Sequence, residues 1–436
     1  MKREKSKLLI LFLATMALNV HAQRYLSMNE ALTSAHENNA SSQISDLEER
    51  IAYANYRQTD AVFLPQIELG YSAVSTNNPL NAFGFLLNQA SVTAADFDPT
   101  KLNDPGSVEN YNAKAEMRLP LLNLDMIYAR KGAKSQREVY LYKSARTKQY
   151  VDFEVKKMYN QLQFSYKAKE ILEQSLADVK AIHRTSENFY AQGLIQESDV
   201  LNALVQVNTI EAALAKAKSN IHNASEGLAV LIGTKEEGVV YLTDSLDMPR
   251  QAIIEKQPLS LGRADIMALE KAVEAAGMMQ KSAVMSFLPR INAFGTYQLN
   301  DSKAFGFDAN SYMAGISLSW TIFSGNRNRS KYKSYQYQKI KLEKEKELHI
   351  QQSNLELNKT YRELSDFQVE IQKHTTSVEQ ATEALRILNN RYKEGLSNTT
   401  DLLAAQAQLS QQQLLRSQAV MSYNVTKAYI EFLSEK

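Results

Sequence analysis

Few side chains in this sequence have the types and spacing that catalysis or metal binding requires. Among 436 residues there are 6 histidines and no cysteine, which excludes thiolate ligands, cysteine nucleophiles and disulfides. The histidines are scattered, and none forms a paired motif such as His-Glu-x-x-His. At least four residues separate any two glycines, so the chain has no glycine-rich phosphate loop. We therefore expect no enzyme, no cofactor and no metal site.

Two aspartates occur in equivalent contexts after a repeated glycine motif. The pattern Tyr-x-x-Gly-Leu occurs twice, with Gly193 followed by Asp199 in the first copy and Gly395 followed by Asp401 in the second. Glycine at these positions is expected to end a helix in the left-handed conformation. The aspartates are then expected to begin the next helices, where a carboxylate suits the exposed N–H groups and the positive dipole end. A capping role is therefore expected for both aspartates, and it does not prevent a second role for either residue.

The repeated motifs indicate a tandem duplication. A second motif, Phe-Leu-Pro, lies at residues 63–65 and again at residues 287–289. The first half has more residues between its Phe-Leu-Pro and Tyr-x-x-Gly-Leu motifs than the second half has. These extra residues fit an enlarged loop at residues 77–106, which is rich in Asn, Asp, Pro and Gly. The predicted domains are a first repeat at residues 23–232, a linker at residues 233–262 and a second repeat at residues 263–436.

Very long helices are predicted in both repeats. Residues 133–192, 326–394 and 396–436 contain neither proline nor glycine. A helix through the first of these segments would be about 90 Å long and one through the second about 100 Å, whereas the mean globular helix has about 11–12 residues. The long helices are predicted at about residues 126–192 and 327–394, each followed by a glycine turn and a returning helix.

The N-terminus has the features of a secretory signal peptide. Residues 2–7 are rich in lysine and arginine, an 11-residue apolar run follows, and Val20-His21-Ala22 resembles a cleavage site. We predict a signal peptide at residues 1–22 and a mature chain that begins at Gln23. The first mature helix is expected to start at Ser27, with Glu30 completing a capping box.

Four segments alternate between apolar and polar residues with the period of a β-strand. They lie at about residues 66–76, 110–121, 290–300 and 311–323, and each has about the length of a membrane strand. Four strands cannot close a barrel, and an open edge cannot lie in lipid, so membrane strands would require several chains to share one barrel. Soluble half-buried hairpins are the alternative. The polar face of the second strand, which would line the lumen, consists of Asn112, Lys114, Glu116 and Arg118.

Taken together, these features resemble the TolC-type outer-membrane efflux factor family over essentially the whole mature chain. The resemblance rests on the order and duplication of several motifs, including the Phe-Leu-Pro strand entries, the strand exits at residues 120–123 and 322–325, and Arg263-Ala264-Asp265-Ile266. It implies a mainly α fold with a transmembrane β-barrel portion, in which a homotrimer shares a twelve-stranded barrel that continues into a long α-helical barrel. The linker at residues 233–262 would join an equatorial belt.

The resemblance also implies a function and a place in the cell. Such a protein is an exit duct in the outer membrane of a Gram-negative bacterium, extends into the periplasm, and serves a tripartite efflux or type I secretion system. It is a passive conduit, opened at its periplasmic tip by an adaptor (membrane fusion) protein and an inner-membrane pump. The nearly balanced charge, 50 basic against 48 acidic residues, gives no reason to expect a nucleic-acid partner.

The family's tip positions can be transferred onto this sequence. The aperture residues would be Asp199, Asp401, Ser198 and Tyr392, with the tip turns at Gly193 and Gly395. Three chains would bring six carboxylates towards the axis, where an acidic ring favours cations. The sequence departs from some members of the family at Ser397 and Ala404, where a basic and an acidic residue occur.

A periplasmic coiled-coil protein, either structural or an adaptor, is the alternative function. An adaptor would have one helical hairpin outside glycine- and valine-rich β domains, and usually a membrane anchor. This sequence instead predicts two hairpins with strands between the helices. No motif identifies the transported substrate or the class of pump.

Overall fold

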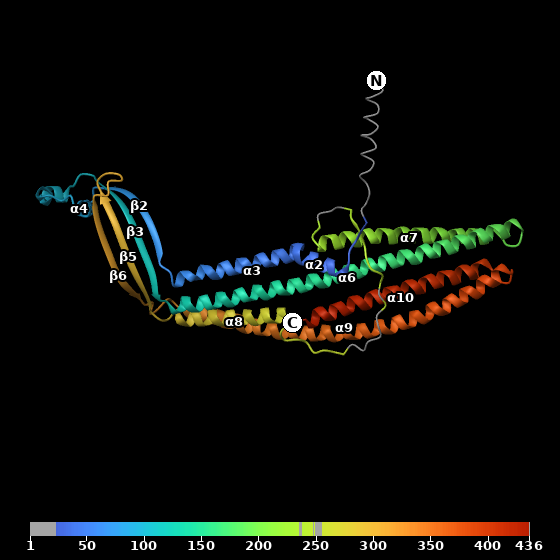
Figure 1. Cartoon of the computed structure of the whole chain (residues 1–436). Coiled ribbons are helices and arrows are strands. Elements are labelled where there is room, and N and C mark those ends of the chain that lie inside the picture. The colour runs from blue at the N-terminus through green and yellow to red at the C-terminus, as the bar shows by residue number, and fades with distance from the viewer. Residues whose placement is uncertain (1–22, 235–237, 247, 249–254, 436) are drawn as a thin grey trace, which may run out of the picture. The chain divides into compact units, whose positions relative to one another are not determined.

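The computed structural model describes residues 23–234, 238–246, 248 and 255–435 (Figure 1). The predicted signal peptide lies outside these residues. The chain forms two compact units, of which the helical unit comprises Met1–Glu48, Tyr142–Met267 and Leu348–Lys436. The sheet unit comprises Glu49–Leu141 and Ala268–Glu347. Each unit takes segments from both sequence repeats.

Helices dominate the described residues, and two of them are very long. The principal helices are α2 (Met28–Asn38), α3 (Ala40–Gln58), α6 (Leu124–Ala191), α7 (Glu197–Leu231), α8 (Ala264–Met285), α9 (Arg327–Lys393) and α10 (Thr399–Ser434). The strands are β1 (Gln23–Tyr25), β2 (Gln66–Thr76), β3 (Val108–Leu122), β4 (Val240–Leu242), β5 (Arg290–Asp301) and β6 (Ala309–Ser319).

Ser27 and Asn39 set the ends of the first helix. Ser27 is the N-cap of α2 and forms a capping box with Glu30, as predicted. The helix then ends at Asn39, whose extended backbone separates α2 from α3. The Asn39 side chain donates to the carbonyl oxygen of Leu231 at 2.8 Å and accepts from the N–H of Ser42 at 3.0 Å. Two helices therefore precede the first long strand, because the Asn39 side chain caps α3 while it binds the end of α7.

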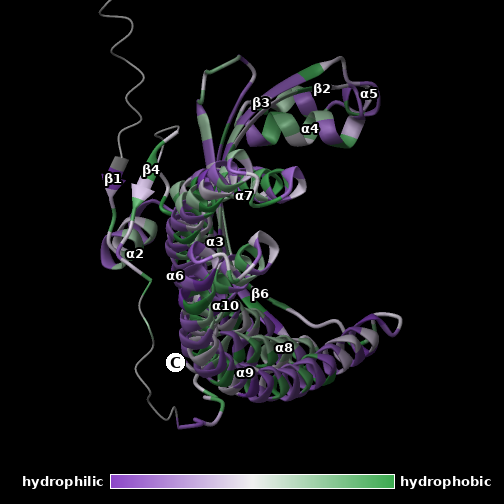
Figure 2. Cartoon of the chain, turned by 90° about the vertical axis from the view of Figure 1, so that its right-hand side faces the viewer, coloured by the Kyte–Doolittle hydropathy of each residue, from purple (hydrophilic) through white to green (hydrophobic). Residues whose placement is uncertain are grey.

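A core in the helical unit lies beneath a small parallel sheet. β1 pairs with β4 in parallel, beside α2 (Figure 2). Tyr159 of α6 is buried below this pair and donates to the carbonyl oxygen of Leu26 at 3.0 Å. Burial raises the pKa of Tyr159 to about 12. β4 lies in the predicted linker, and neither of these three-residue strands is long enough to show a periodic pattern.

In the sheet unit, one antiparallel sheet has the strand order β2-β3-β5-β6 (Figure 1). The first three strands match the predicted segments within about three residues, but β6 ends at Ser319 and not near residue 323. The predicted loop at residues 77–106 is also wrong in part, since it contains α4 (Pro79–Asn88), a 3-10 helix (Ala94–Phe97) and α5 (Pro99–Asn103). Asn78 and Asp98 cap α4 and α5, and each precedes a proline that occupies the first helical position.

Candidate functional site

The sheet of the sheet unit carries most of its large apolar side chains on one exposed face. The register places Leu69, Tyr297 and Tyr312 in one row across β2, β5 and β6. A soluble antiparallel sheet buries such a face against a core, and a large exposed apolar patch marks a contact with a membrane or a partner. Further large apolar side chains that are exposed on this face are Ile67, Tyr71, Met117, Ile316 and Leu318.

The opposite face of the sheet is mainly polar and charged, and its large apolar residues include Val74, Phe294 and Met313. It includes all four predicted lumen residues, and Lys114 forms an ion pair with Glu116. Arg118 contacts the same carboxylate at 3.3 Å, and Asn112 donates to the side-chain oxygen of Asn300 at 2.8 Å. The structure thus brings these side chains together in one polar layer. They are Asn112, Lys114, Glu116 and Arg118.

Both edges of this sheet lack a partner strand within the described part of the chain. β2 pairs only with β3, and β6 pairs only with β5. Each edge strand has 11 residues, and long unpaired strands of this kind present a row of free backbone donors and acceptors. The edge strands β2 and β6 can therefore form backbone hydrogen bonds with strands of another chain.

In the helical unit, the two glycine turns have the same geometry. Gly193 and Gly395 both have φ +73°. In the first turn, Leu194 N–H donates to the carbonyl oxygen of Phe189 at 2.9 Å, and Gly193 N–H donates to that of Tyr190 at 2.8 Å. The second turn repeats both bonds, at 2.8 and 3.0 Å. These are Schellman motifs, which satisfy the last carbonyl groups of the long helices α6 and α9.

Each return helix begins two residues before the aspartate that was predicted to begin it. α7 begins at Glu197 and α10 at Thr399, so each aspartate is the third residue of its helix. The Asp199 carboxylate accepts from the N–H of Gln196 at 3.2 Å, while Asn398 caps α10 by accepting from the Asp401 N–H at 2.7 Å. Asp401 is exposed and Asp199 is partly exposed, so neither carboxylate is buried by this arrangement.

Tyr392 is a buried link between helices. Its side chain is 2% exposed, and its hydroxyl lies 2.9 Å from Ser186 Oγ on α6 and 3.1 Å from Thr399 Oγ1 on α10. The ring also contacts Phe189. Neither hydroxyl partner is a carboxylate, so the structure does not pair Tyr392 with either aspartate. Ser186 and Thr399 were missed by the sequence reasoning, because pairing between helices leaves no sequence pattern.

Replacing Tyr392 with phenylalanine should loosen the end of this helix bundle. The change keeps the ring but removes a hydroxyl that satisfies two buried partners, which costs about 1–3 kcal/mol. Hydrogen exchange near residues 186 and 399 should be faster in the variant. Tyr190→Phe is the matched control, because this tyrosine precedes the other tip glycine but is exposed. Equal exchange in both variants would contradict a linking role for Tyr392.

A second buried polar cluster in the helical unit contains the motif residues Arg263 and Asp265. Arg263 is 2% exposed and donates to Asp265 at 2.7 and 2.8 Å and to Ser353 of α9 at 2.6 Å. Its remaining nitrogen donates to the carbonyl oxygen of Leu433 in α10 at 3.2 Å. His349 lies 2.7 Å from the same carboxylate. The cluster therefore fastens α8, α9 and α10 to one another.

Neither a membrane helix nor a metal cluster occurs in the part of the chain described above. None of the described helices contains a stretch that is long and apolar enough to cross a membrane. Within the same residues, no three histidine, aspartate or glutamate side chains are placed to hold a metal ion.

A sheet that exposes its apolar face, together with pairs of very long helices, is typical of outer-membrane channel proteins. The comparisons with known proteins agree with this class. The family model described as outer membrane efflux protein matches residues 31–234 and 258–431. The chain belongs to this family, and its function is that of an efflux channel in the outer membrane of Gram-negative bacteria. No curated protein matches the sequence.

Solved structures show the same fold at low sequence identity. A membrane protein from Pseudomonas aeruginosa is 18% identical, with a TM-score of 0.81 over 93% of this chain and 92% of that one. The outer membrane protein VceC from Vibrio cholerae is 20% identical, with a TM-score of 0.75 over 93% and 96%. The MtrE channel from Neisseria gonorrhoeae, in its open state, is 17% identical, with a TM-score of 0.76 over 93% and 88%.

Proposed function

We propose that three copies of this chain join their sheets edge to edge, β6 of one copy against β2 of the next, and so enclose the lumen of an export duct. One observation carries this proposal, namely a sheet with an exposed apolar face, a polar face and two unpaired edges. Closure removes every edge, as lipid requires. The apolar face then meets lipid, and Asn112, Lys114, Glu116 and Arg118 line the lumen.

The duct needs partners and performs no catalysis. A closed barrel lets substrates through but supplies no energy, so a pump in the inner membrane must drive export. A periplasmic adaptor protein would connect that pump to the tip formed by the Gly193 and Gly395 turns. The aperture would be set by Asp199, Asp401 and Ser198, with Tyr392 holding the helices behind it. The family relationship supports this assembly.

The subunit count tests the proposal. The mature protein would be extracted in mild detergent from fractionated outer membranes and its mass determined by light scattering. A trimer is the expected result. A monomer recovered from the soluble periplasm would mean that the strands are ordinary hairpins, and the shared duct would be rejected.

The tip carboxylates should bind cations at the aperture. Replacing both Asp199 and Asp401 with asparagine removes six negative charges from a trimer, and we expect the affinity for a blocking trivalent cation to fall at least about tenfold, which is about 1.4 kcal/mol. Block of single channels by hexaamminecobalt in planar bilayers measures this affinity. Glu383→Gln, a change in an exposed ion pair on α9, is the control. Unchanged block in the double variant would contradict a role for these aspartates in cation binding.

A further inference from the structure

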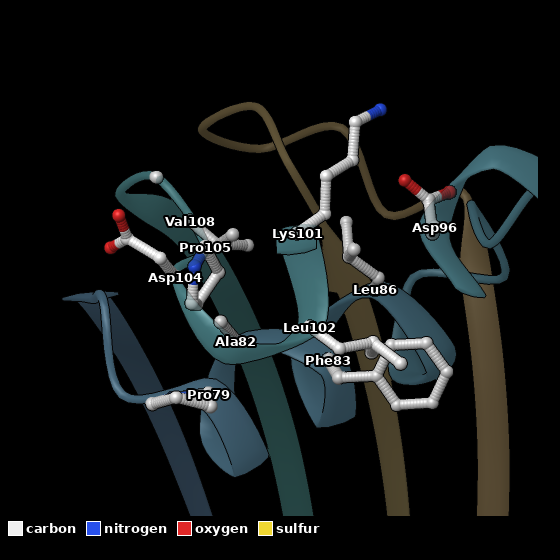
Figure 3. A pocket seen from close by; sticks show the side chains of 11 residues that line it. Pro79, Ala82, Phe83, Leu86, Asp96, Lys101, Leu102, Asp104, Pro105 and Val108 are labelled. Carbon is white, nitrogen blue, oxygen red and sulfur yellow. The ribbon is translucent and has the colours of Figure 1, made fainter. Parts of the chain in front are cut away.

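The segment at residues 77–106 lies on the polar face of the sheet. α4 contacts both β3 and β6, and the Gln89 amide donates to the carbonyl oxygen of Glu109 at 2.7 Å and to Asn110 Oδ1 at 3.0 Å. Asn110 in turn donates to Asn300 Oδ1 at 3.1 Å, in the same polar layer as Asn112. Figure 3 shows α4 running in front of the strands.

This segment is an ordered element and crosses most of the sheet. The four strands span about 14 Å at a spacing of about 4.8 Å, and the 10-residue helix α4 is about 15 Å long. Phe83 of α4 packs edge-on against Phe97, with ring centroids 5.5 Å apart. The residues around Leu102 close a pocket of about 250 Å³ against α4 (Figure 3). The segment thus projects from the polar face as a packed body.

A shared barrel leaves little room for three such bodies. Twelve strands with a spacing of about 4.8 Å and a tilt near 40° form a barrel with a radius of about 12 Å. A helix with its side chains is about 10 Å thick. Three copies of α4 on the inner wall would therefore reach the axis and touch one another. α4 lies at the strand ends opposite those that join the long helices, which corresponds to the outer mouth of the duct.

We propose that the segments at residues 77–106 of three chains contact one another across the axis and close the outer mouth of the duct. This inference rests on the proposed trimer. α4 carries large apolar side chains with no cover within the described chain, since Leu80 is 82% exposed and Leu87 is 55% exposed. Lipid lies on the other face of the sheet, so the same surface of a second copy is the apolar partner within reach. The duct then has a barrier at each end.

Cysteine crosslinking tests the contact, because the chain has no cysteine of its own. In L80C, and separately in L87C, a bismaleimide that spans about 10 Å should join two of the three chains, so that about two thirds of the protein becomes covalent dimer. Y312C is the control. Tyr312 is similarly exposed but lies on the apolar face of β6, where equivalent residues of a three-fold barrel are about 20 Å or more apart.

The subunit count of the same samples separates the two hypotheses. A trimer that forms dimer in L80C or L87C but not in Y312C supports the closed outer mouth. A trimer with no crosslink in either leucine variant overturns the closed mouth and leaves the proposed duct intact. Monomers in all samples reject the shared duct, and the inference is rejected with it.

Discussion

Replacing Asp265 with asparagine is expected to lower the free energy of unfolding by about 3–5 kcal/mol, since the change leaves a buried guanidinium without its counter-charge. Arg263 makes both of its shortest charged contacts to this carboxylate. The asparagine amide also turns a donor group towards the guanidinium, which can only donate. Because Arg263 binds α9 and the end of α10 as well, the loss should loosen three helices at once.

A second arginine, Arg146, increases the destabilisation that we expect from Asp265→Asn. Burial lowers the pKa of Arg146 to about 10, against the favourable charge of Asp265. Its guanidinium donates to the carbonyl oxygen of Phe432 at 2.8 Å and lies over the ring of the same residue. The Arg146 Nε lies 3.9 Å from Asp265. Asp265 is therefore the carboxylate that the buried Arg263 and the partly buried Arg146 share, and asparagine cannot take its place.

Thermal unfolding followed by circular dichroism measures the effect in the purified protein in detergent. Asp366→Asn is the matched control, because it makes the same chemical change at an exposed position of α9. We expect a clearly lower midpoint for Asp265→Asn and no change for the control. Equal midpoints would mean that the cluster does not hold the helices together.

The pH dependence of stability gives a second test of the same cluster. Burial alone would raise the pKa of Asp265, but the hydrogen bonds from Arg263 and His349 outweigh it and lower the pKa from 3.8 to about 2. A lowered pKa contributes stability that is present above about pH 4 and is lost as the pH falls towards 2, about 2 kcal/mol in this case. The wild-type protein should lose this contribution over that range, whereas Asp265→Asn has none to lose.

The sequence predicts the long helices and the sheet because both leave strong periodic or compositional signals. Long segments without proline or glycine correspond to α6, α9 and α10, and the alternating segments correspond to β2, β3, β5 and β6. The capping box at Ser27 is local and was also predicted correctly. Local sequence signals thus decide the long helices and the four strands of the large sheet.

The remaining features depend on contacts between distant segments or on an ambiguous local signal. Asn78-Pro79 and Asp98-Pro99 indicate a turn as readily as a capped helix, and the structure has helices at both. The parallel pairing of β1 with β4 joins residues more than two hundred positions apart. Ser186, which contacts Tyr392, and Ser353, which contacts Arg263, lie on other helices, and no spacing in the sequence predicts these contacts.

An arginine in place of Ile316 should prevent assembly in the outer membrane. Ile316 is 71% exposed on the apolar face of β6. In water an arginine at such a position would be fully solvated, whereas in the lipid-facing band of a barrel it costs up to about 2–4 kcal/mol. A trimer would carry three of these charges. We expect the fraction of trimer in purified outer membranes, measured by light scattering after mild extraction, to fall severalfold or more.

Ser317→Arg is the control, because Ser317 is the next residue of β6 and lies on the polar face of the sheet. In the proposed duct its arginine would point into a water-filled lumen, so trimer should form at the normal level. A soluble hairpin would tolerate Ile316→Arg as well, since both positions are exposed in the single chain. Equal trimer levels in the two variants would therefore contradict a lipid-facing role for the apolar face. Loss confined to Ile316→Arg would assign that face to the membrane independently of any comparison with other channels.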